Sequence, residues 1–153
     1  MYVPNGREVD DPKYFYKLEW FKHLLAFVEQ EMIRYDKVVV TGDFNIAPAD
    51  EDVHDPELWK DRILCSKPER NCFQKLTELG LVDAFREFDQ PAESYSWWDY
   101  RAAGFRRNLG LRIDLIMISD ALRKVCTGCS IDKEPRKWER PSDHTPVVAE
   151  FEL

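Results

Sequence analysis

The chain has 153 residues, of which 44% are hydrophobic and 33% charged, and its formal net charge is −7 with a pI near 5.0. These values exclude a disordered chain and a protein that coats nucleic acid through bulk positive charge, and the length suits one domain with its own core. No apolar run is long enough to cross a bilayer, and the N-terminus lacks the pattern of a signal peptide, so we expect a cytoplasmic protein that does not act at a membrane.

The first third of the chain predicts a turn, a long helix and a strand. Residues 2–6, YVPNG, have the composition of an extended segment that enters a turn. Residues 12–34 predict the longest helix, because apolar side chains recur every three or four positions and Pro12 suits a first turn. Its apolar positions are Phe15, Leu18, Phe21, Leu25, Val28 and Met32. Residues 37–45, KVVVTGDFN, predict a strand that is buried on both faces and runs into a turn.

The remaining elements predict an α/β fold, with a mixed sheet backed by helices. Residues 46–69 predict a long loop, residues 70–79 a short helix that Gly80 ends, and residues 81–88 fit either a helix or irregular structure. A polar loop at residues 101–110 separates segments of strand composition. These segments are residues 94–100, 112–119 and 145–153.

Four cysteines are present, and two of them, Cys126 and Cys129, form a CxxC motif. Alone, this motif is a weak signal for zinc or redox chemistry. Cys65 and Cys72 are too far apart to make a second such pair, and no histidine is near either pair. We therefore interpret all four as structural thiols.

One carboxylate stands inside a segment that otherwise predicts a buried strand. In RIDLIMIS, residues 112–119, the pleat places Asp114 on the face opposite to Leu115 and Met117. An ionised carboxylate there is costly unless a partner meets it. An imidazole is a suitable partner, because the carboxylate fixes its tautomer and stabilises its protonated form, and His144 is the candidate.

Polar groups also stand at the ends of two other predicted strands, where ligand sites of α/β folds collect. Asp43 and Asn45 follow the strand at residues 37–45, and Asp143 and His144 precede the last strand. Turn capping or a solvated loop would explain either group alone. Together with Asp114 they favour a site in which Asp43 and Asn45 orient and deprotonate a water. Asp143 would bind a hard cation such as Mg²⁺, which is the usual equipment for phosphate-ester hydrolysis.

Five motifs occur in an order and spacing that resembles the exonuclease III/AP endonuclease family, within the endonuclease/exonuclease/phosphatase superfamily. The motifs are YVPNG (2–6), GDFN (42–45), SWWDYR (96–101), NLGLRID (108–114) and SDH (142–144). GDFN and SDH indicate only the superfamily, whereas SWWDYR with NLGLRID indicates the DNA-repair branch. The resemblance implies a single domain over residues 1–153. This domain would be equivalent to the C-terminal half of a four-layered α/β sandwich and would lack the family's N-terminal half.

The resemblance also implies roles for five catalytic residues. Tyr2 and His144 would contact the scissile phosphate, and Asp114 would be the partner of that histidine. Asp43 would activate or position the attacking water, and Asn45 would steady Asp43 and the phosphate. Each assignment rests on the position of the residue within its motif.

The implied metal is Mg²⁺, with Mn²⁺ as an alternative, and Asp143 is its implied ligand. The family's first half supplies a metal-binding glutamate that has no counterpart here, so we expect Mg²⁺ to bind weakly. That half also supplies a second sheet. Without it, the inner face of this sheet would expose apolar residues, which favours self-association or pairing through that face.

The implied partner is double-stranded DNA with abasic sites or 3′ ends. Trp97, Leu111 and Ile113 resemble an apolar pocket that accepts a flipped-out abasic sugar, whereas Trp98 is typical of sheet core. The other implied DNA-binding residues are Arg101, Arg106, Arg107, Asn108 and Arg112. The four arginines give this stretch a local positive charge suited to DNA phosphates.

Three functional hypotheses follow. The first is a Mg²⁺-dependent DNA repair hydrolase that cuts 5′ to abasic sites and removes nucleotides from 3′ ends. The second is a phosphodiesterase of the same superfamily that acts on phosphoinositides or other small phosphate esters. The third is a catalytically inactive module that binds DNA or serves assembly, because the metal-binding glutamate has no counterpart.

Overall fold

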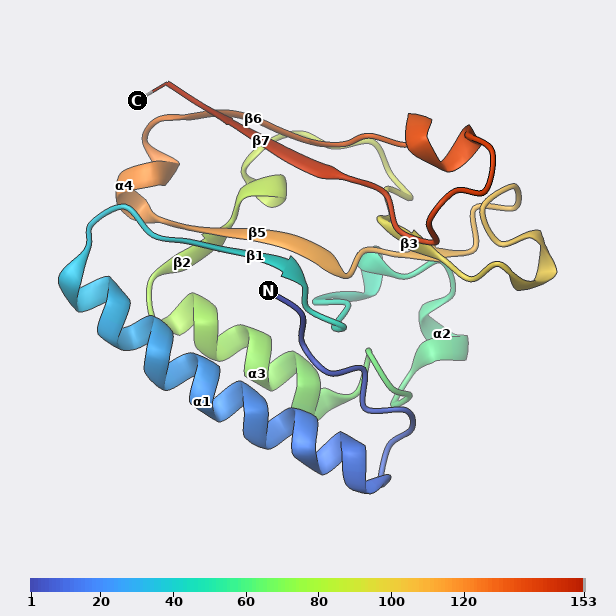
Figure 1. Ribbon diagram of the computed structural model, residues 1–153, viewed down its shortest axis with the longest axis horizontal. Coiled ribbons are helices and arrows are strands. Elements are labelled where there is room, and N and C mark those ends of the chain that lie inside the picture. Colours follow the sequence, from blue (N-terminus) through green and yellow to red (C-terminus); the bar gives the residue numbers. More distant parts are fainter. Residues whose placement is uncertain (153) are drawn as a thin grey trace.

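Two long helices cover one face of a central sheet, and a strand pair covers the other face (Figure 1). The structure is a computed structural model and describes residues 1–152. The helices are α1 (Pro12–Arg34), α2 (Pro56–Trp59), α3 (Lys67–Glu78) and α4 (Asp120–Arg123). The strands are β1 (Val39–Asp43), β2 (Leu81–Asp83), β3 (Trp97–Trp98), β4 (Gly110–Leu111), β5 (Asp114–Ser119), β6 (Cys126–Ile131) and β7 (Val147–Phe151). They pair antiparallel as β1–β5–β2, β3–β4 and β6–β7, which confirms the predicted α/β class.

Helix α1 has the predicted bounds, but its buried face is rotated in the first turns. Asp11 caps the helix by accepting a hydrogen bond from the Lys13 backbone N–H at 2.8 Å. Phe15, expected in the core, is exposed, and the buried positions near it are Tyr14 and Lys17. Farther along the helix, Phe21 and Val28 are buried as expected. The apolar period therefore predicted the helix but not which face of its first turns is buried.

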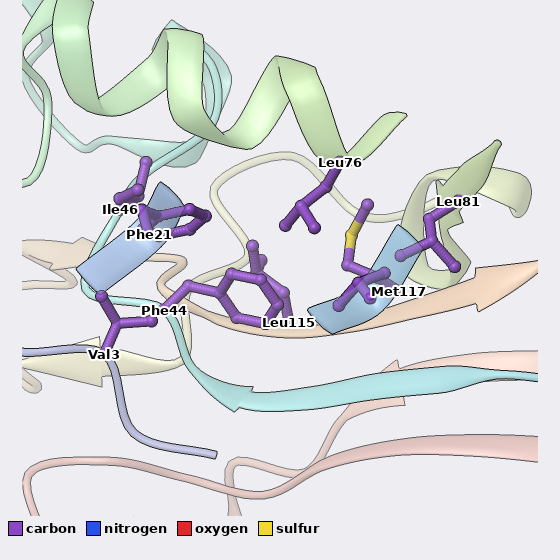
Figure 2. Close-up of a cluster of buried hydrophobic side chains, with 9 residues drawn as sticks. Val3, Phe21, Phe44, Ile46, Leu76, Leu81, Leu115 and Met117 are labelled. Carbon is purple, nitrogen blue, oxygen red and sulfur yellow. The ribbon is translucent and has the colours of Figure 1, made fainter. Parts of the chain in front are cut away.

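The first core cluster lies between α1, α3 and the central sheet, and Figure 2 shows it. Its buried members are Val3, Phe21, Val28, Phe44, Ile46, Leu76, Leu81, Leu115 and Met117. Because Phe44 and Ile46 flank Asn45, the core fixes the chain on both sides of the turn that follows β1.

Strand β5 alternates between two cores, as the sequence predicts. Leu115 and Met117 face the helices, whereas Ile116 and Ile118 pack in a separate cluster with β6, β7 and the short 3₁₀ helix η2 (Ala84–Glu87). The expectation of a bare inner sheet face is therefore wrong for β5, because β6 and β7 fold over it. In this cluster Cys129 is buried and Cys126 packs against it, and all four cysteines are free thiols.

Three local expectations are corrected. Strand β1 is not buried on both faces, since it lies at the sheet edge and Val39 is 45% exposed. The loop at residues 46–69 contains the 3₁₀ helix η1 (Asp50–Asp52) and α2. Helix α3 begins at Lys67, earlier than expected, because Glu69 and Ser66 form a capping box.

The other strand segments are shorter than expected. Residues 81–88 divide into β2 and η2, residues 94–100 contain only the two-residue β3, and residues 145–153 contain β7. Val147, Ala149 and Phe151 share the inward face of β7, and Leu153, the last residue of the predicted strand, lies outside the described residues. No helix within residues 1–152 is long and apolar enough to span a membrane.

Candidate active site

A cleft of about 1060 Å³ opens where β1 and β5 meet the loops of β3 and β7. Its hydrogen-bonding and catalytic-type groups are Tyr2, Asn5, Asp43, Asn45, Asp143 and His144. Its apolar wall is formed by Trp59, Ile63, Leu64, Trp97 and Ile113. Five of the six predicted catalytic and metal residues thus line one cleft, and the sixth, Asp114, lies directly behind His144.

The turn after β1 holds Asp43 in a fixed orientation. The backbone N–H of Asn45 donates to Asp43 Oδ1 at 2.8 Å, and Asn45 Nδ2 donates to Asp43 Oδ2 at 3.0 Å. This geometry requires a left-handed backbone at Asn45 (φ 48°), which asparagine tolerates better than most residues. Both carboxylate oxygens therefore have a donor from the same residue, which limits rotation of the Asp43 side chain.

The N-terminal segment is bound to the same turn. Tyr2 forms a parallel bridge with Asp43, and the Val3 N–H donates to the Asp43 carbonyl at 2.9 Å. Asn45 Nδ2 donates to the Val3 carbonyl at 2.8 Å, and Asn5 Nδ2 donates to Asn45 Oδ1 at 3.1 Å. These bonds explain how YVPNG and GDFN, distant in sequence, lie at one site.

Asp114 contacts His144, as the sequence analysis expected. His144 Nδ1 lies 2.9 Å from Asp114 Oδ2 and 3.1 Å from Oδ1, while His144 Nε2 lies 3.9 Å from Asp43 Oδ2. Asp43 and Asp114 are direct neighbours in the β1–β5 register. The β3 segment bridges to the backbone of His144 through Trp97, and Asp114 of β5 is the hydrogen-bond partner of the ring. When Nδ1 donates to Asp114, Nε2 is the ring atom nearer to Asp43.

Burial and neighbouring charges shift the pKa values of this group. The pKa of Asp43 is raised to about 6, mainly by burial and in part by the nearby Asp114 carboxylate, against the opposing effect of the hydrogen bond from the Asn45 N–H. Burial lowers the pKa of His144, but the hydrogen bond and charge of Asp114 outweigh burial and raise it overall. The site therefore holds a histidine with an increased tendency to be charged and a carboxylate that exchanges protons near neutral pH.

Asp143 is oriented by β3. Its Oδ2 accepts a hydrogen bond from Trp97 Nε1 at 3.0 Å, and its carbonyl accepts from the Trp98 N–H at 3.0 Å. Residues 1–152 hold no cluster of three or more histidine, cysteine, aspartate or glutamate side chains suited to a metal. Mg²⁺ commonly binds through one or two carboxylates and several waters, so Asp143 fits that mode but does not form a complete metal cage.

Two DNA-contact predictions are wrong, because the side chains are enclosed. Arg112 is 1% exposed, and it donates to Asp52 Oδ1 at 2.6 Å and to Asp83 Oδ2 at 2.7 Å. Leu111 is fully buried behind the apolar wall of the cleft, beside Ile113. Neither side chain can touch a bound nucleic acid in this conformation.

The other predicted contacts divide between surface and interior. Arg101, Arg106 and Arg107 are exposed, and Arg101 lines the cleft. Both ends of the Asn108 amide are bound within the protein, since Oδ1 accepts from Trp98 Nε1 at 3.1 Å and Nδ2 donates to a backbone carbonyl. Trp98 is fully buried, in agreement with its interpretation as core.

Several cleft residues were missed by the sequence analysis. Trp59 and Ile63 come from the segment interpreted as a plain loop, and Arg7 and Arg62 add positive charge to the cleft. Lys17 donates to the Asn45 carbonyl at 2.6 Å from a fully buried position on α1. A lysine one turn before Phe21, on the side that faces the core, was the signal that could have identified it.

Comparison with known proteins assigns these motifs to one family. The sequence profile described as Endonuclease/Exonuclease/phosphatase family matches residues 2–144. Exodeoxyribonuclease III of Haemophilus influenzae is 35% identical over 158 residues, which cover 98% of this chain and 59% of that protein.

Two solved structures share the fold over the whole chain. The 3′ phosphatase NExo from Neisseria, bound to a product DNA hairpin, is 49% identical with a TM-score of 0.98, over 100% of this chain and 60% of its own. An AP endonuclease from Archaeoglobus fulgidus is 37% identical with a TM-score of 0.92, again over 100% of this chain and 60% of its own. The chain thus spans about three fifths of the length of these relatives.

Proposed function

Because the chain belongs to the endonuclease/exonuclease/phosphatase family, we propose that it carries the phosphate-hydrolysing centre of an exodeoxyribonuclease III-type DNA repair enzyme. The proposed reactions are 3′-to-5′ removal of nucleotides and cleavage 5′ to abasic sites. The observation that carries the proposal is the cleft in which Asp43, Asn45 and the Asp114–His144 pair converge. The relatives named for DNA 3′ ends and for abasic-site cleavage support the substrate class.

The geometry supports in-line attack of water on phosphorus. Asp43, held by Asn45, accepts the proton of the attacking water, for which a pKa of about 6 is well matched. His144, whose charged form Asp114 favours, donates a hydrogen bond from Nε2 to a phosphate oxygen and stabilises its developing negative charge. Tyr2, at the cleft surface, contacts the same phosphate. The bond from phosphorus to the leaving 3′ oxygen breaks, that oxygen takes a proton from solvent to become a 3′-hydroxyl, and the phosphate stays on the other product.

Asp143 is the proposed ligand of a divalent cation, with Mg²⁺ as the first candidate and Mn²⁺ as the alternative. When bound, such a cation supplies positive charge to the phosphate oxygens. The hydrogen bond from Trp97 fixes the orientation of the Asp143 carboxylate. Since the described residues lack a three-ligand cluster, we expect weak cation binding by this chain alone.

The DNA strand is proposed to cross the cleft between the exposed arginines and the apolar wall. Arg101, Arg106 and Arg107 contact phosphates, and an abasic sugar lies against Trp97, which packs on the almost fully buried Ile113. This placement needs no contact from Leu111 or Arg112.

Cleavage of two DNA substrates tests the proposal. Duplexes carrying an abasic site or a recessed 3′ end are incubated with the chain in Mg²⁺, with and without EDTA. We expect cleavage that EDTA stops and that Asp43→Asn reduces about 10²- to 10⁴-fold without changing DNA affinity. Near-normal cleavage by Asp43→Asn would show that the water-activating role is wrong. Hydrolysis of a phosphoinositide instead of DNA would favour the small-ester alternative.

A second function, DNA binding without turnover, is favoured by the incomplete metal cage. It predicts that the wild-type chain binds abasic duplex with an affinity that EDTA does not change. It also predicts no product at any Mg²⁺ or Mn²⁺ concentration. Product formation by the isolated chain would exclude it.

A further inference from the structure

We propose that the buried Lys17–Glu69 ion pair positions the Asp43–Asn45 turn for catalysis, so that Lys17 is a positioning residue of the site. This inference rests on the proposed function. Both side chains have 0% exposure, and they join α1 to the first turn of α3 directly beneath the cleft. Neither residue lines the cleft, so neither would touch the substrate.

All three hydrogen-bond donors of the Lys17 ammonium are accounted for. One contacts Glu69 Oε1, one donates to the Asn45 carbonyl at 2.6 Å, and one donates to the Asn5 carbonyl at 3.2 Å. Asn5 and Asn45 are themselves joined, since Asn5 Nδ2 donates to Asn45 Oδ1 at 3.1 Å. A single ammonium thus fixes the backbone of both segments that hold the Asp43 carboxylate.

Glu69 connects the same lysine to the opposite wall of the cleft. Its Oε1 accepts from the Leu64 N–H at 3.1 Å, and its Oε2 accepts from the N–H and hydroxyl of Ser66 at 3.1 and 2.6 Å. Leu64 lines the cleft with a left-handed backbone (φ 72°), an uncommon conformation that its surroundings must maintain. Its carbonyl accepts from the Ala47 N–H at 2.8 Å, which closes a connection back to the turn.

A neutral replacement of Lys17 and Glu69 distinguishes two roles of the pair, which are stabilising the fold and positioning the Asp43–Asn45 turn. A buried ion pair can be replaced by a neutral pair of similar shape with little loss of stability. The replacement Lys17→Met with Glu69→Gln removes both charges, the donors to the Asn45 and Asn5 carbonyls, and one of the two oxygens that accept from Leu64 and Ser66. If the pair served only to stabilise the fold, this double variant would be less stable but would keep the wild-type kcat once folded.

The experiment compares the double variant with a matched exposed pair on α1. Lys22 and Glu19 are 69% and 56% exposed, so Lys22→Met with Glu19→Gln is the control. For each protein we measure kcat and KM on a duplex with an abasic site in Mg²⁺, and amide hydrogen exchange at Asn45. We expect the buried double variant to unfold cooperatively, with kcat lowered about 10- to 100-fold and KM within about twofold of wild type. Its Asn45 amide should exchange on the order of tenfold faster, and the control should match wild type.

Wild-type kcat and wild-type exchange at Asn45 in the buried double variant would overturn the proposal. If the double variant does not fold, Lys17→Arg decides instead, because arginine keeps the charge but cannot place its donors as an ammonium does. Lys17→Arg is expected to lower kcat and accelerate exchange, and wild-type values of both would overturn the proposal. If the wild-type chain does not hydrolyse DNA, the function proposal fails, while amide exchange alone still decides the role of the pair.

Discussion

Two charged groups two residues apart, Arg112 and Asp114, show how differently this fold uses buried charge. Arg112 is enclosed and donates to two carboxylates, those of Asp52 and Asp83. Asp114 is partly exposed, and its partner His144 opens onto the cleft. Full enclosure with opposite charges is typical of a structural network, whereas Asp114 holds a partly exposed histidine at the cleft, where the proposed function places the reaction.

The largest effect is expected when the structural network is broken. Arg112→Met leaves the Asp52 and Asp83 carboxylates buried without their shared partner, and we expect a loss of about 3–5 kcal/mol in the free energy of unfolding. Denaturant titration measures this loss, and the exposed Arg101→Met should change the value by less than about 0.5 kcal/mol. A loss below about 1 kcal/mol for Arg112→Met would contradict the structural assignment of this network.

The next effect concerns Asp43 and is a dependence of stability on pH. Its pKa is near 3.8 when exposed and about 6 in the folded protein, so the unfolded chain releases this proton first as pH rises. Stability due to protonated Asp43 is therefore present at pH 4 and lost as pH rises through about 6. Asp43→Asn removes this pH-dependent loss of stability. In EDTA we therefore expect the unfolding free energy of Asp43→Asn, relative to that of the wild type, to increase by up to about 3 kcal/mol from pH 4 to pH 7.

The test is how much this stability difference changes between pH 4 and pH 7. The difference at a single pH is not informative, because the asparagine side chain also alters local hydrogen bonds at every pH. The raised pKa of His144 weakens the fold over the same direction of pH change, but the hydrogen bond and charge of Asp114, which raise that pKa more than Asp43 does, are present in both proteins. An advantage of Asp43→Asn that is equal at pH 4 and pH 7 would contradict the pKa assigned to Asp43.

The reactive pair should affect rate more than stability. Asp114→Asn replaces the acceptor of His144 Nδ1–H and weakens the charged form of the ring. We expect kcat for DNA hydrolysis to fall about 10- to 100-fold, with an unfolding free energy within about 1 kcal/mol of wild type. Asp61→Asn, an exposed carboxylate of the same cleft, is the matched control and should leave kcat unchanged. Equal losses in both variants would mean that cleft charge, and not the histidine partner, determines the rate.

The same two regions show what the sequence could reveal. Asp43, Asn45, Asp143 and His144 were predicted from short motifs, because strand ends with turn residues are local signals. Burial of Arg112 was not predictable in this way, because its partners come from η1 and the end of β2, 60 and 29 residues away. The reversal of its predicted role therefore reflects tertiary contacts that no local pattern contains.

Helix α1 and the loop at residues 46–69, which support the site, were also only partly predictable from the sequence. The period of residues 12–34 gave the bounds of α1, but Phe15 is exposed and Lys17 is buried, because the first turns are oriented by Asn5, Asn45 and Glu69. Residues 46–69 lack a regular pattern, yet they form part of the cleft wall through contacts with β4 and α3. Arg112 and Lys17, whose burial the sequence did not reveal, have partners far along the chain that no motif indicates.

The smallest effect is expected from the exposed arginines, which should contribute to DNA binding and little to the fold. Arg101, Arg106 and Arg107 are exposed, in contrast to Arg112. Changing each to Gln should lower the slope of log Kd against log salt by about 1 per arginine and leave the unfolding free energy within about 0.5 kcal/mol. Fluorescence anisotropy with abasic duplex measures the slope, and Arg34→Gln, which removes an exposed ion pair with Glu31 at the end of α1, is the control. An unchanged slope in the triple variant would place the DNA path elsewhere, because an arginine that neutralises a phosphate releases a counterion whatever the DNA sequence.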